Sequence, residues 1–395
     1  MQRRPGTPSL LRELNDRSAL ELLLAGGPMT RAQLGEHTGL SKVTASQLLS
    51  RLEERGIVAV AGELAGGRGP NAALYAVVPS TAYVAGLHVD LGEISAGVAD
   101  ITGNVVTRIS VNLTGAEDPV ELVRGAVVAA CAEAGVPPEA LRAIVIGTPG
   151  VLDPRTGDPR LAVNLPAWHE GVLDALRSDL GKPVTLENDV NLAAMAERAV
   201  GAAVAVDDFV LVWIGVGLGL ATVLGGRLYR GAGGAAGEIG YLPVPGVPLP
   251  RDVTHPETGA FQRLVGAQAL VPLAAEHGIR GVTAAEAVTL AVQGAARGDQ
   301  RPAAFLAELA GRVATGVAAI SVVLDPGLVV LGGDVGRAGG TQLASRVAAA
   351  VGRISPARPA VVPTAVDGAP VLRGAILAAV DQARAELLES VADPF

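Results

Sequence analysis

Apolar residues at helical spacing, interrupted by turn residues, characterise the first 40 positions of the chain. A first helix is expected to begin at Asn15 or Asp16, either of which can cap it, and to run through Ala25 to a Gly-Gly-Pro break. Thr30 is expected to cap a short second helix over residues 31–37. The pattern therefore predicts two helices separated by a tight turn.

A third helix has the clearest amphipathic pattern of this segment. Ser41 is expected to cap it, and it should run to about Arg55. Its apolar residues recur at spacings of three and four, which predicts a face turned towards a core: Ala45, Leu48, Leu49 and Leu52. Four polar side chains fall on the other faces and are expected to stay free: Lys42, Thr44, Gln47 and Arg51.

Two strand-like runs follow the helices. Residues 57–61 and 73–78 read as strands, and the glycine-rich segment 62–71 reads as the loop between them. This order predicts a winged helix-turn-helix whose wing tip carries Arg68. Pro79 and Ser80 are the expected boundary of a first domain over residues 1–80.

From residue 81 the pattern changes to strands alternating with alanine-rich helices. Strands are expected at 84–90, 95–100, 104–111, 143–147 and 183–187, and helices at 119–134, 172–180, about 340–352 and 371–390. The uncharged run from Phe209 to Gly226 is as long as a membrane span, but its glycines favour two buried strands joined by a turn. We therefore expect an α/β domain over 81–395, with lobes of about 81–200 plus the C-terminal helices and about 201–370. Two such halves around a cleft form the architecture of actin-like ATPases and sugar kinases.

Composition and charge refine this picture. Of the 395 residues 49% are hydrophobic and 18% charged, which is typical of a globular chain. The first 80 residues contain nine Arg and Lys against seven Asp and Glu, a net charge of +2, whereas the rest contain 22 against 32, a net charge of −10. A basic head on an acidic body suits a DNA-binding module. Cys131 is the only cysteine, which excludes an internal disulfide. No signal peptide is visible, so a cytoplasmic protein is expected.

Four motifs in this order resemble the ROK family, which contains sugar-responsive repressors and sugar kinases. They are Thr-Gly-Leu-Ser at 38–41, Gly-Gly-Arg at 66–68, Glu-Asn-Asp-Val-Asn at 187–191 and Gly-Ala-Ala-Gly-Glu-Ile-Gly at 234–240. The resemblance covers nearly the whole chain. It implies a winged helix-turn-helix joined to a two-lobed, actin-like sugar-binding domain.

The resemblance also implies a sugar site. In the family's kinases the residue matching Asp189 is the general base, and the residues matching Asn188, Glu238 and Asn164 contact sugar hydroxyls. Asp189 follows a strand and opens a helix, so an N-cap is the alternative for it. Trp168 stays open between stacking beneath a sugar ring and packing in the core.

Other positions depart from the family pattern on this side. Tyr241 replaces the family's sugar-contacting histidine, which is also commonly a zinc ligand. The loop over residues 242–261 contains no cysteine, and His255 stands alone in it. Gln262 replaces a further sugar-binding glutamate. We therefore expect Tyr241 in the sugar site but no zinc and no cofactor.

The phosphate-binding turns depart further. The family's kinases open with Asp-x-Gly-Gly-Thr, but residues 90–94 here place Glu93 and Ile94 at the last two positions. The second turn has Val216 where a hydroxyl residue is usual. Glu93 would repel phosphates, and the Gly332-Gly333 pair can equally serve a plain strand-to-helix turn. The chain is therefore expected to bind no ATP and to be no enzyme.

The first domain has an ordinary helical bundle as its alternative. The Ser41 cap exposes Lys42 and Thr44 at the start of the third helix, where side chains reach base edges, and Gln47 lies one turn further on. Arg68 on the wing suits a narrow minor groove. These features favour DNA binding over the plain bundle.

Together these inferences predict a DNA-binding transcriptional regulator, a repressor, whose body senses a sugar or sugar derivative. Its expected partners are a double-stranded operator, the sugar, and further copies of itself in a homodimer or dimer of dimers, with no membrane. Two alternatives stay open: an active sugar kinase that kept a DNA-binding head, and a regulator whose body senses no sugar.

Overall fold

The structure is a computed structural model that describes residues 8–65, 71–90, 92–112, 118–161, 168, 171–253 and 255–392. Its first segment, here called the head, contains these elements: α1 (Pro8–Gly26), β1 (Met29–Thr30), α2 (Arg31–Thr38), α3 (Lys42–Glu54), β2 (Val58–Leu64) and β3 (Ala72–Val77). The strands form an antiparallel sheet in the order β1-β3-β2, and a single 3₁₀ turn (Pro79–Thr81) leads out of it. The bounds 1–80 and 81–395 stay a prediction.

Local capping explains the two short helices of the head. The Thr30 side chain accepts a hydrogen bond from the Gln33 amide, and the Gln33 side chain bonds back to the Thr30 amide. Gly39, in the left-handed region at φ +69°, ends α2, and Ser41 Oγ accepts from the Thr44 amide at 3.2 Å to begin α3. The four residues of the predicted stripe are buried. Both caps and the core-facing stripe are therefore confirmed.

Two expectations about the head were wrong. α1 begins at Pro8, not at Asn15 or Asp16, so neither of those residues caps it. Asp16 instead lies inside the helix and accepts hydrogen bonds from Arg51 on α3, including Nε to Oδ2 at 3.1 Å. Arg51 is therefore paired and is not free for a ligand.

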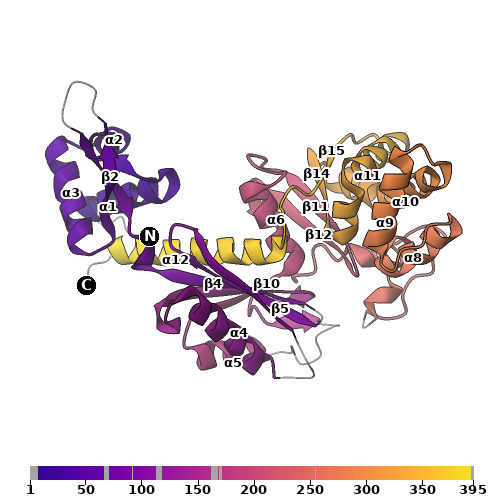
Figure 1. Cartoon of the computed structure of the whole chain (residues 1–395), viewed down its shortest axis with the longest axis horizontal. Coiled ribbons are helices and arrows are strands. Elements are labelled where there is room, and N and C mark those ends of the chain that lie inside the picture. The colour runs from indigo at the N-terminus through magenta and orange to yellow at the C-terminus, as the bar shows by residue number, and fades with distance from the viewer. Residues whose placement is uncertain are drawn as a thin grey trace.

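The first lobe is a five-stranded sheet in the order β10-β7-β4-β5-β6. Its strands are β4 (Tyr83–Asp90), β5 (Glu93–Asp100), β6 (Val105–Asn112), β7 (Leu141–Thr148) and β10 (Val184–Asn188). The first three form an antiparallel meander, and β7 and β10 run parallel to β4. Helices α4 (Pro119–Ala134) and α5 (Val172–Leu180) cover one face, and α6 (Asp189–Val200) and α12 (Pro370–Ala392) lie on the other (Figure 1). A small hairpin, β8 (Val151–Leu152) with β9 (Pro159–Leu161), extends from this lobe.

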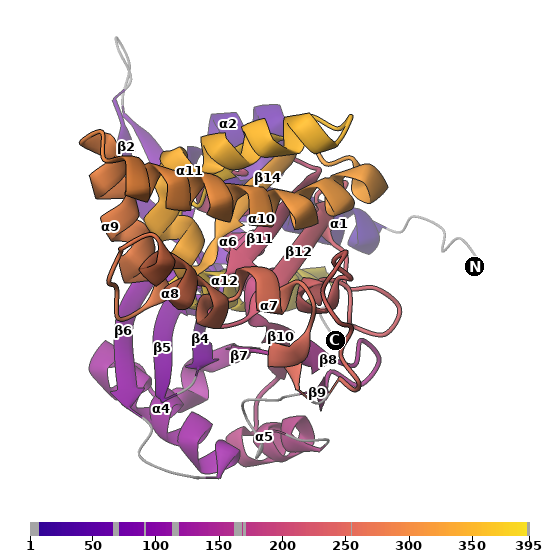
Figure 2. The same cartoon turned by 90° about the vertical axis from the view of Figure 1, so that its right-hand side faces the viewer.

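The second lobe repeats the theme with a sheet in the order β13-β12-β11-β14-β15. Its strands are β11 (Phe209–Ile214), β12 (Leu218–Leu224), β13 (Arg227–Leu228), β14 (Leu328–Gly332) and β15 (Ala360–Pro363). Its helices are α7 (Gln262–Val265), α8 (Ala267–Glu276), α9 (Ala284–Ala296), α10 (Gln300–Leu324) and α11 (Gly333–Ile354), of which α8 to α11 lie on the side of the molecule away from the head (Figure 2). Two 3₁₀ turns of this lobe lie at Ile239–Tyr241 and Pro256–Thr258, and one of the first lobe lies at Pro138–Ala140. The expected pair of strands within Phe209–Gly226 is confirmed.

Among the described residues, α10 is long and apolar enough to cross a membrane by length and composition alone. Its most apolar window is 56% buried within the lobe, where α10 packs against α9 and α11. The helix is thus accounted for as a core helix.

The last helix, α12, joins the head to the two lobes, which together are called the body. α12 packs against α6, β4 and β7 of the first lobe and against α1 of the head. The fit to the lobe is tight, because a Cβ built on Gly374 would lie 1.9 Å from the Leu192 carbonyl oxygen on α6. At its far end the Arg55 guanidinium donates to the Ser390 carbonyl at 3.2 Å. One apolar cluster therefore runs from the head through α12 to α6.

Candidate functional site

Asn188 and Asp189 lie where strand β10 ends and helix α6 begins. Asn188 caps the helix: its Oδ1 accepts from the Asn191 amide at 3.1 Å, and its Nδ2 donates to the Gly150 carbonyl at 3.1 Å. The capping role considered for Asp189 thus belongs to Asn188. Asp189 is the first residue of the helix and accepts from the Val190 amide at 2.8 Å. Its carboxylate is therefore placed at the positive end of the helix dipole.

The surroundings of Asp189 disfavour the ionised form of its carboxyl group. Burial raises the pKa of its carboxyl most strongly, the charge of His88 opposes that rise, and the charge of Asp90 adds to it. These groups come from the ends of β4 and β10 in the first lobe. A carboxyl in such surroundings is a candidate for ligand contact.

Glu238 brings a second carboxyl from the second lobe to the same place. It precedes the 3₁₀ turn Ile239–Tyr241, and burial together with the charge of Asp189 raises its pKa to about 7. Within the described part of the chain its side chain makes no hydrogen bond, although it is only partly exposed. An under-satisfied polar group of this kind is ready to bond a polar ligand. We call Asn188, Asp189, Glu238 and Tyr241 the sugar side.

Tyr241 lies near Glu238 but is already engaged. Its hydroxyl donates to the Val253 carbonyl at 2.7 Å, and burial and the charge of Glu238 raise its pKa. The hydroxyl oxygen keeps its capacity to accept. Asn164 lies outside the described residues. Trp168 is 5% exposed and belongs to the apolar core of the first lobe, which favours the packing role considered for it.

Gln262 is not aimed at a ligand. Its Oε1 accepts from the Leu218 amide at 2.9 Å, and its Nε2 donates to the Val216 carbonyl at 2.8 Å. Both ends of the amide therefore hold the turn between β11 and β12. A glutamate could not make the second of these bonds, because an ionised carboxylate has no donor.

The phosphate side, defined as Glu93, Ile94 and residues 215–217, is satisfied internally. Glu93 Oε1 accepts from Ser110 Oγ at 2.7 Å and from Ser95 Oγ at 3.0 Å, and these bonds, that of Ser110 most strongly, lower its pKa. Ile94 is 1% exposed and Val216 is 63% exposed, and neither hydrocarbon side chain has a hydroxyl to offer. A Cβ built on Gly333 would lie 2.4 Å from the Ile214 carbonyl oxygen, which gives this glycine a packing role.

Sequence reasoning missed an ion pair beside the sugar side. Glu187, which precedes Asn188 directly, accepts two hydrogen bonds from the guanidinium of Arg230 in the second lobe. Glu187 stands in the recognised motif and Arg230 directly precedes the glycine-rich run, so their positions were visible. Their contact spans 43 residues and leaves no local signal in the sequence.

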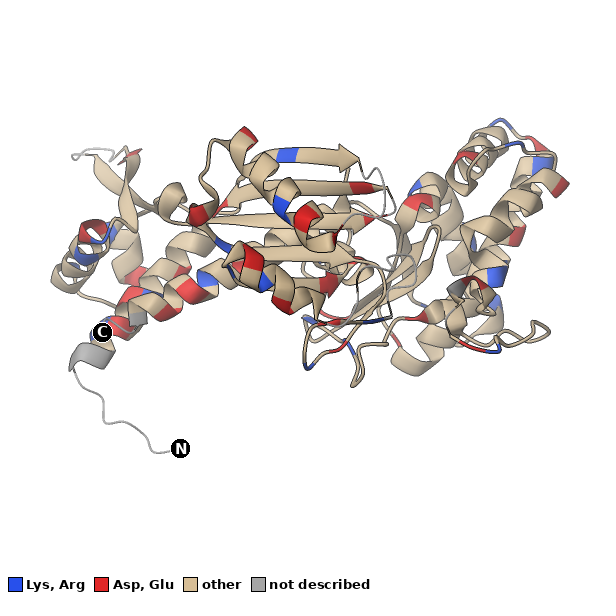
Figure 3. Cartoon of the chain, turned by 90° about the horizontal axis from the view of Figure 1, so that it is seen from below, with Lys and Arg blue, Asp and Glu red and all other residues tan. Residues whose placement is uncertain are grey.

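The candidate DNA-binding residues lie on α3 of the head. Ser41, Lys42 and Gln47 are exposed, Thr44 is half-buried, and the hydroxyls of Ser41 and Thr44 are 2.9 Å apart. Gln47 lines a groove of about 540 Å³ with these residues of α1 and α3: Arg12, Ser46, Ser50, Arg51 and Glu54. Charged residues of both signs lie on the head (Figure 3). Arg68 lies outside the described residues.

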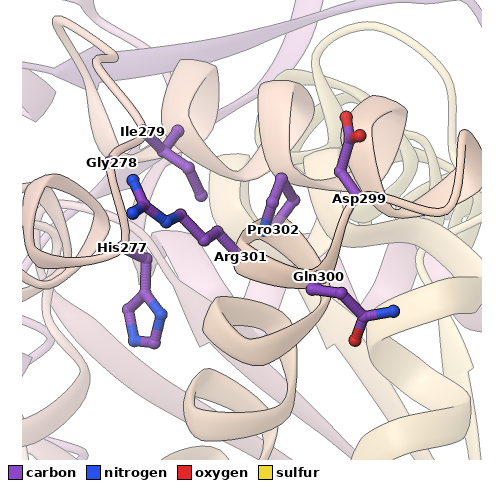
Figure 4. Close-up of a pocket in the computed structure, with 7 residues that line it drawn as sticks. All are labelled: His277, Gly278, Ile279, Asp299, Gln300, Arg301 and Pro302. Carbon is purple, nitrogen blue, oxygen red and sulfur yellow. The ribbon is translucent and has the colours of Figure 1, made fainter.

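No group of three or more His, Cys, Asp and Glu suited to a metal occurs among the residues described, and His255 lies 3.3 Å from Glu257. Zinc independence stays a prediction. A separate cavity of about 340 Å³ lies where α8 ends and α10 begins, lined by residues 277–279 and 299–302 (Figure 4). It shares no residue with the sugar side.

Comparison with known proteins gives matches over most of the chain. Residues 85–381 match the ROK family and residues 14–69 match the MarR family. A xylose repressor from Caldicellulosiruptor bescii is 27% identical over 244 residues, which are 60% of this chain and 61% of that repressor's length. A ROK hexokinase from Thermus thermophilus is 30% identical, with a TM-score of 0.61 over 77% of this chain and 99% of that one.

A solved structure that includes a head shares the whole fold. It is a ROK family transcriptional regulator described as a homolog of the E. coli MLC protein, with a TM-score of 0.74. The match covers 97% of this chain and 99% of that one at 17% identity, which shows a common fold. The expected α/β body with an N-terminal winged helix is thereby confirmed.

Proposed function

Since the chain belongs to the ROK family and its head matches the MarR family, we propose that it is a DNA-binding transcriptional repressor whose body senses a sugar. The observation that carries this proposal is the presence, on one chain, of a capped helix with exposed polar residues and a pair of partly buried carboxyls. The xylose repressor and the regulator of the same fold support it. The protein then acts in the cytoplasm, where its operator is.

The sugar side offers the chemistry that a sugar needs. Asp189 and Glu238 can accept hydrogen bonds from hydroxyl groups, Asn188 can accept a second one, and Tyr241 can accept one. Asn164 is part of this proposal by its motif alone. Fixed donors and acceptors in a partly buried site select a polyhydroxylated ligand over an apolar one.

The fold provides a continuous route from the sugar side to the head. Asp189 opens α6, α6 packs on α12, and α12 packs on α1 and receives the Arg55 hydrogen bond. A ligand that favours one arrangement of the lobes then changes the placement of the head through α12. Regulation requires a coupling of about 1–3 kcal/mol between the two sites, roughly 5- to 150-fold in operator affinity.

The head is proposed to place α3 in the major groove. Lys42 at its start suits a phosphate contact, Thr44 and Gln47 lie where base edges are reached, and Arg68 belongs to the wing. We propose a homodimer or dimer of dimers on a palindromic operator, with half-sites about 10 base pairs apart or multiples of that.

The competing function is sugar phosphorylation. The identity with the hexokinase and the position of Asp189 favour it. The phosphate side argues against it, because Glu93, matched by motif to the phosphate turn, has a carboxylate with a lowered pKa that would repel phosphates. The chain is therefore proposed to be no enzyme.

An operator selected in vitro and used in fluorescence anisotropy tests the proposal. Lys42→Ala should weaken binding to all sequences and reduce the slope of log affinity against log salt by about one. Gln47→Ala should relax base preference at one position by about 1–3 kcal/mol. Lys182→Ala is the matched control, because Lys182, the other lysine, lies on the body and donates to the Glu139 carbonyl.

Two results would contradict the proposal. The head would not be the DNA reader if Lys42→Ala and Gln47→Ala both kept full affinity and base preference. The body would be a non-sensing one if operator affinity stayed flat across pentoses and hexoses, beginning with D-xylose and D-glucose.

A further inference from the structure

The carboxylate of Glu187 is saturated with hydrogen bonds at the end of β10. Its Oε1 accepts from the Asn188 amide at 2.9 Å and from Asn191 Nδ2 at 2.8 Å. Its Oε2 accepts from Arg230 Nε at 2.8 Å and Nη2 at 2.6 Å. The Glu187 side chain is 10% exposed and that of Arg230 is 48% exposed. Arg230 therefore supplies the countercharge of a nearly buried carboxylate.

This ion pair joins the two lobes beside the sugar side. Glu187 directly precedes Asn188 and Asp189 in the first lobe. Arg230 follows β13 of the second lobe and directly precedes the segment 231–237, which leads to Glu238. The pair thus fixes the start of the segment that carries one carboxyl against the strand that carries the other.

The segment 231–237 meets the first lobe at two further points. Arg160 Nη1 on β9 donates to the Gly233 carbonyl at 3.2 Å. A Cβ built on Gly234 would lie 1.8 Å from the Leu152 carbonyl oxygen on β8, so the backbones are in direct contact there. The chain therefore meets the first lobe at Arg230, just before the segment, and again at Gly233 and Gly234 within it.

We propose that Arg230 is a positioning residue for the sugar site: its ion pair with Glu187 holds segment 231–237, and with it Glu238, at the distance from Asn188 and Asp189 that a bound sugar requires. This proposal rests on the proposed sugar-sensing function. Arginine suits the role because two different nitrogens of its planar guanidinium, Nε and Nη2, donate to the same carboxylate oxygen, whereas lysine has only one nitrogen. Loss of the pair lets the segment move and leaves Glu187 uncompensated.

The test compares Arg230→Met, Arg230→Lys and a matched control. Arg198→Met is the control, because the Arg198 side chain is 44% exposed and pairs with Asp207 at 3.4 Å, away from the sugar side. Calorimetric titration with D-xylose and D-glucose measures affinity, and hydrogen exchange of residues 231–238 without sugar measures the hold on the segment. We expect Arg230→Met to weaken sugar binding at least 10-fold and to speed this exchange. Arg230→Lys should be intermediate, and Arg198→Met should change neither.

The outcomes separate this proposal from the proposed function. Sugar affinity equal to that of the unaltered protein in a folded Arg230→Met, with only a lower melting temperature, would make the pair merely structural and overturn the proposal. If Arg230→Met did not fold, Arg230→Lys would decide, because it keeps the charge. If the unaltered protein bound neither sugar, sugar sensing would be in question. Hydrogen exchange would then still test whether the Glu187–Arg230 ion pair holds the segment. Unchanged exchange at residues 231–238 in Arg230→Met would refute the proposal.

Discussion

The sugar side and the phosphate side of the body treat their carboxyl groups in opposite ways. The Glu238 side chain makes no hydrogen bond among the described residues, and burial and the nearby Asp189 raise its pKa to about 7. Glu93 is exposed, accepts from two serine hydroxyls, and has a lowered pKa. One side therefore holds a carboxyl without a side-chain partner among the described residues, and the other holds a carboxylate whose charge is already hydrogen-bonded.

This difference between the two sides supports the proposed place of the ligand. Leaving a partly buried polar group without a partner costs about 1–3 kcal/mol, which a bound hydroxyl group can offset. Like charges about 4 Å apart near a protein surface repel by about 4 kcal/mol, so a fixed Glu93 opposes a phosphate. Both features agree with the proposal that the body binds a neutral polar ligand rather than an anionic one.

The largest effect should come from Glu238→Gln. Removing a carboxylate that bonds sugar hydroxyls should weaken sugar affinity about 100-fold, since hydrogen bonds to charged groups contribute about 1.5–3 kcal/mol each. Operator affinity without sugar should stay near its normal value, because the head is untouched. Titration calorimetry and operator anisotropy measure the two quantities.

Glu257→Gln is the control for this substitution, since Glu257 is a half-exposed carboxylate in the nearby loop that pairs with His255. If Glu238→Gln destroyed folding and DNA binding together, Glu238 would be a structural residue and the contrast between the two sides would disappear.

A change of pH is expected to have an intermediate effect on sugar affinity. With a pKa of about 7 for Glu238, the fraction of ionised carboxylate rises about 10-fold between pH 6 and 8. Sugar affinity should therefore rise about 10-fold over this range, because the ionised form is the better acceptor. Glu238→Gln should flatten the profile. A flat profile in the unaltered protein would show that Glu238 does not contact the sugar.

Stability should change in the opposite direction over the same range. A raised folded-state pKa means that the folded protein binds this proton more tightly than the unfolded chain does. The contribution of Glu238 to the free energy of unfolding is then fully present below pH 4.5 and is lost as pH rises through about 7. Denaturant melts of the unaltered protein and Glu238→Gln at pH 5 and 8 measure it.

The sequence predicted elements whose signals are local. Helices α4 and α5 were predicted with their observed bounds, and the stripe of α3 is buried, because apolar spacing and glycine ends lie within each segment. The predicted start of α1 was wrong. Asp16 is a residue type that often caps a helix, but here its side chain pairs with Arg51, 35 residues away.

The candidate site divides in the same way. Adjacent Asn188 and Asp189 follow from one motif, but which of them caps α6 depends on where β10 ends. The pairing of Glu187 with Arg230 and the two backbone bonds of Gln262 join segments 43 to 46 residues apart. Only tertiary packing, between the lobes for Glu187 and Arg230 and within the second lobe for Gln262, brings these partners together, so no spacing rule within one segment could identify them.

The smallest effect is expected from ATP, which should leave the thermal stability of the protein almost unchanged. Glu93 stays ionised because Ser95 and Ser110 hold its charge, and Ile94 and Val216 provide no hydroxyl for phosphate oxygens. Millimolar ATP with magnesium should therefore shift the melting temperature by less than about 1 °C, since a ligand far below its dissociation constant adds almost no stability. No ADP should form when D-glucose or D-xylose is added. Asp189→Asn is the decisive control, because sugar-dependent ADP release that this substitution abolished would show that the phosphate side still works and that the body is a kinase.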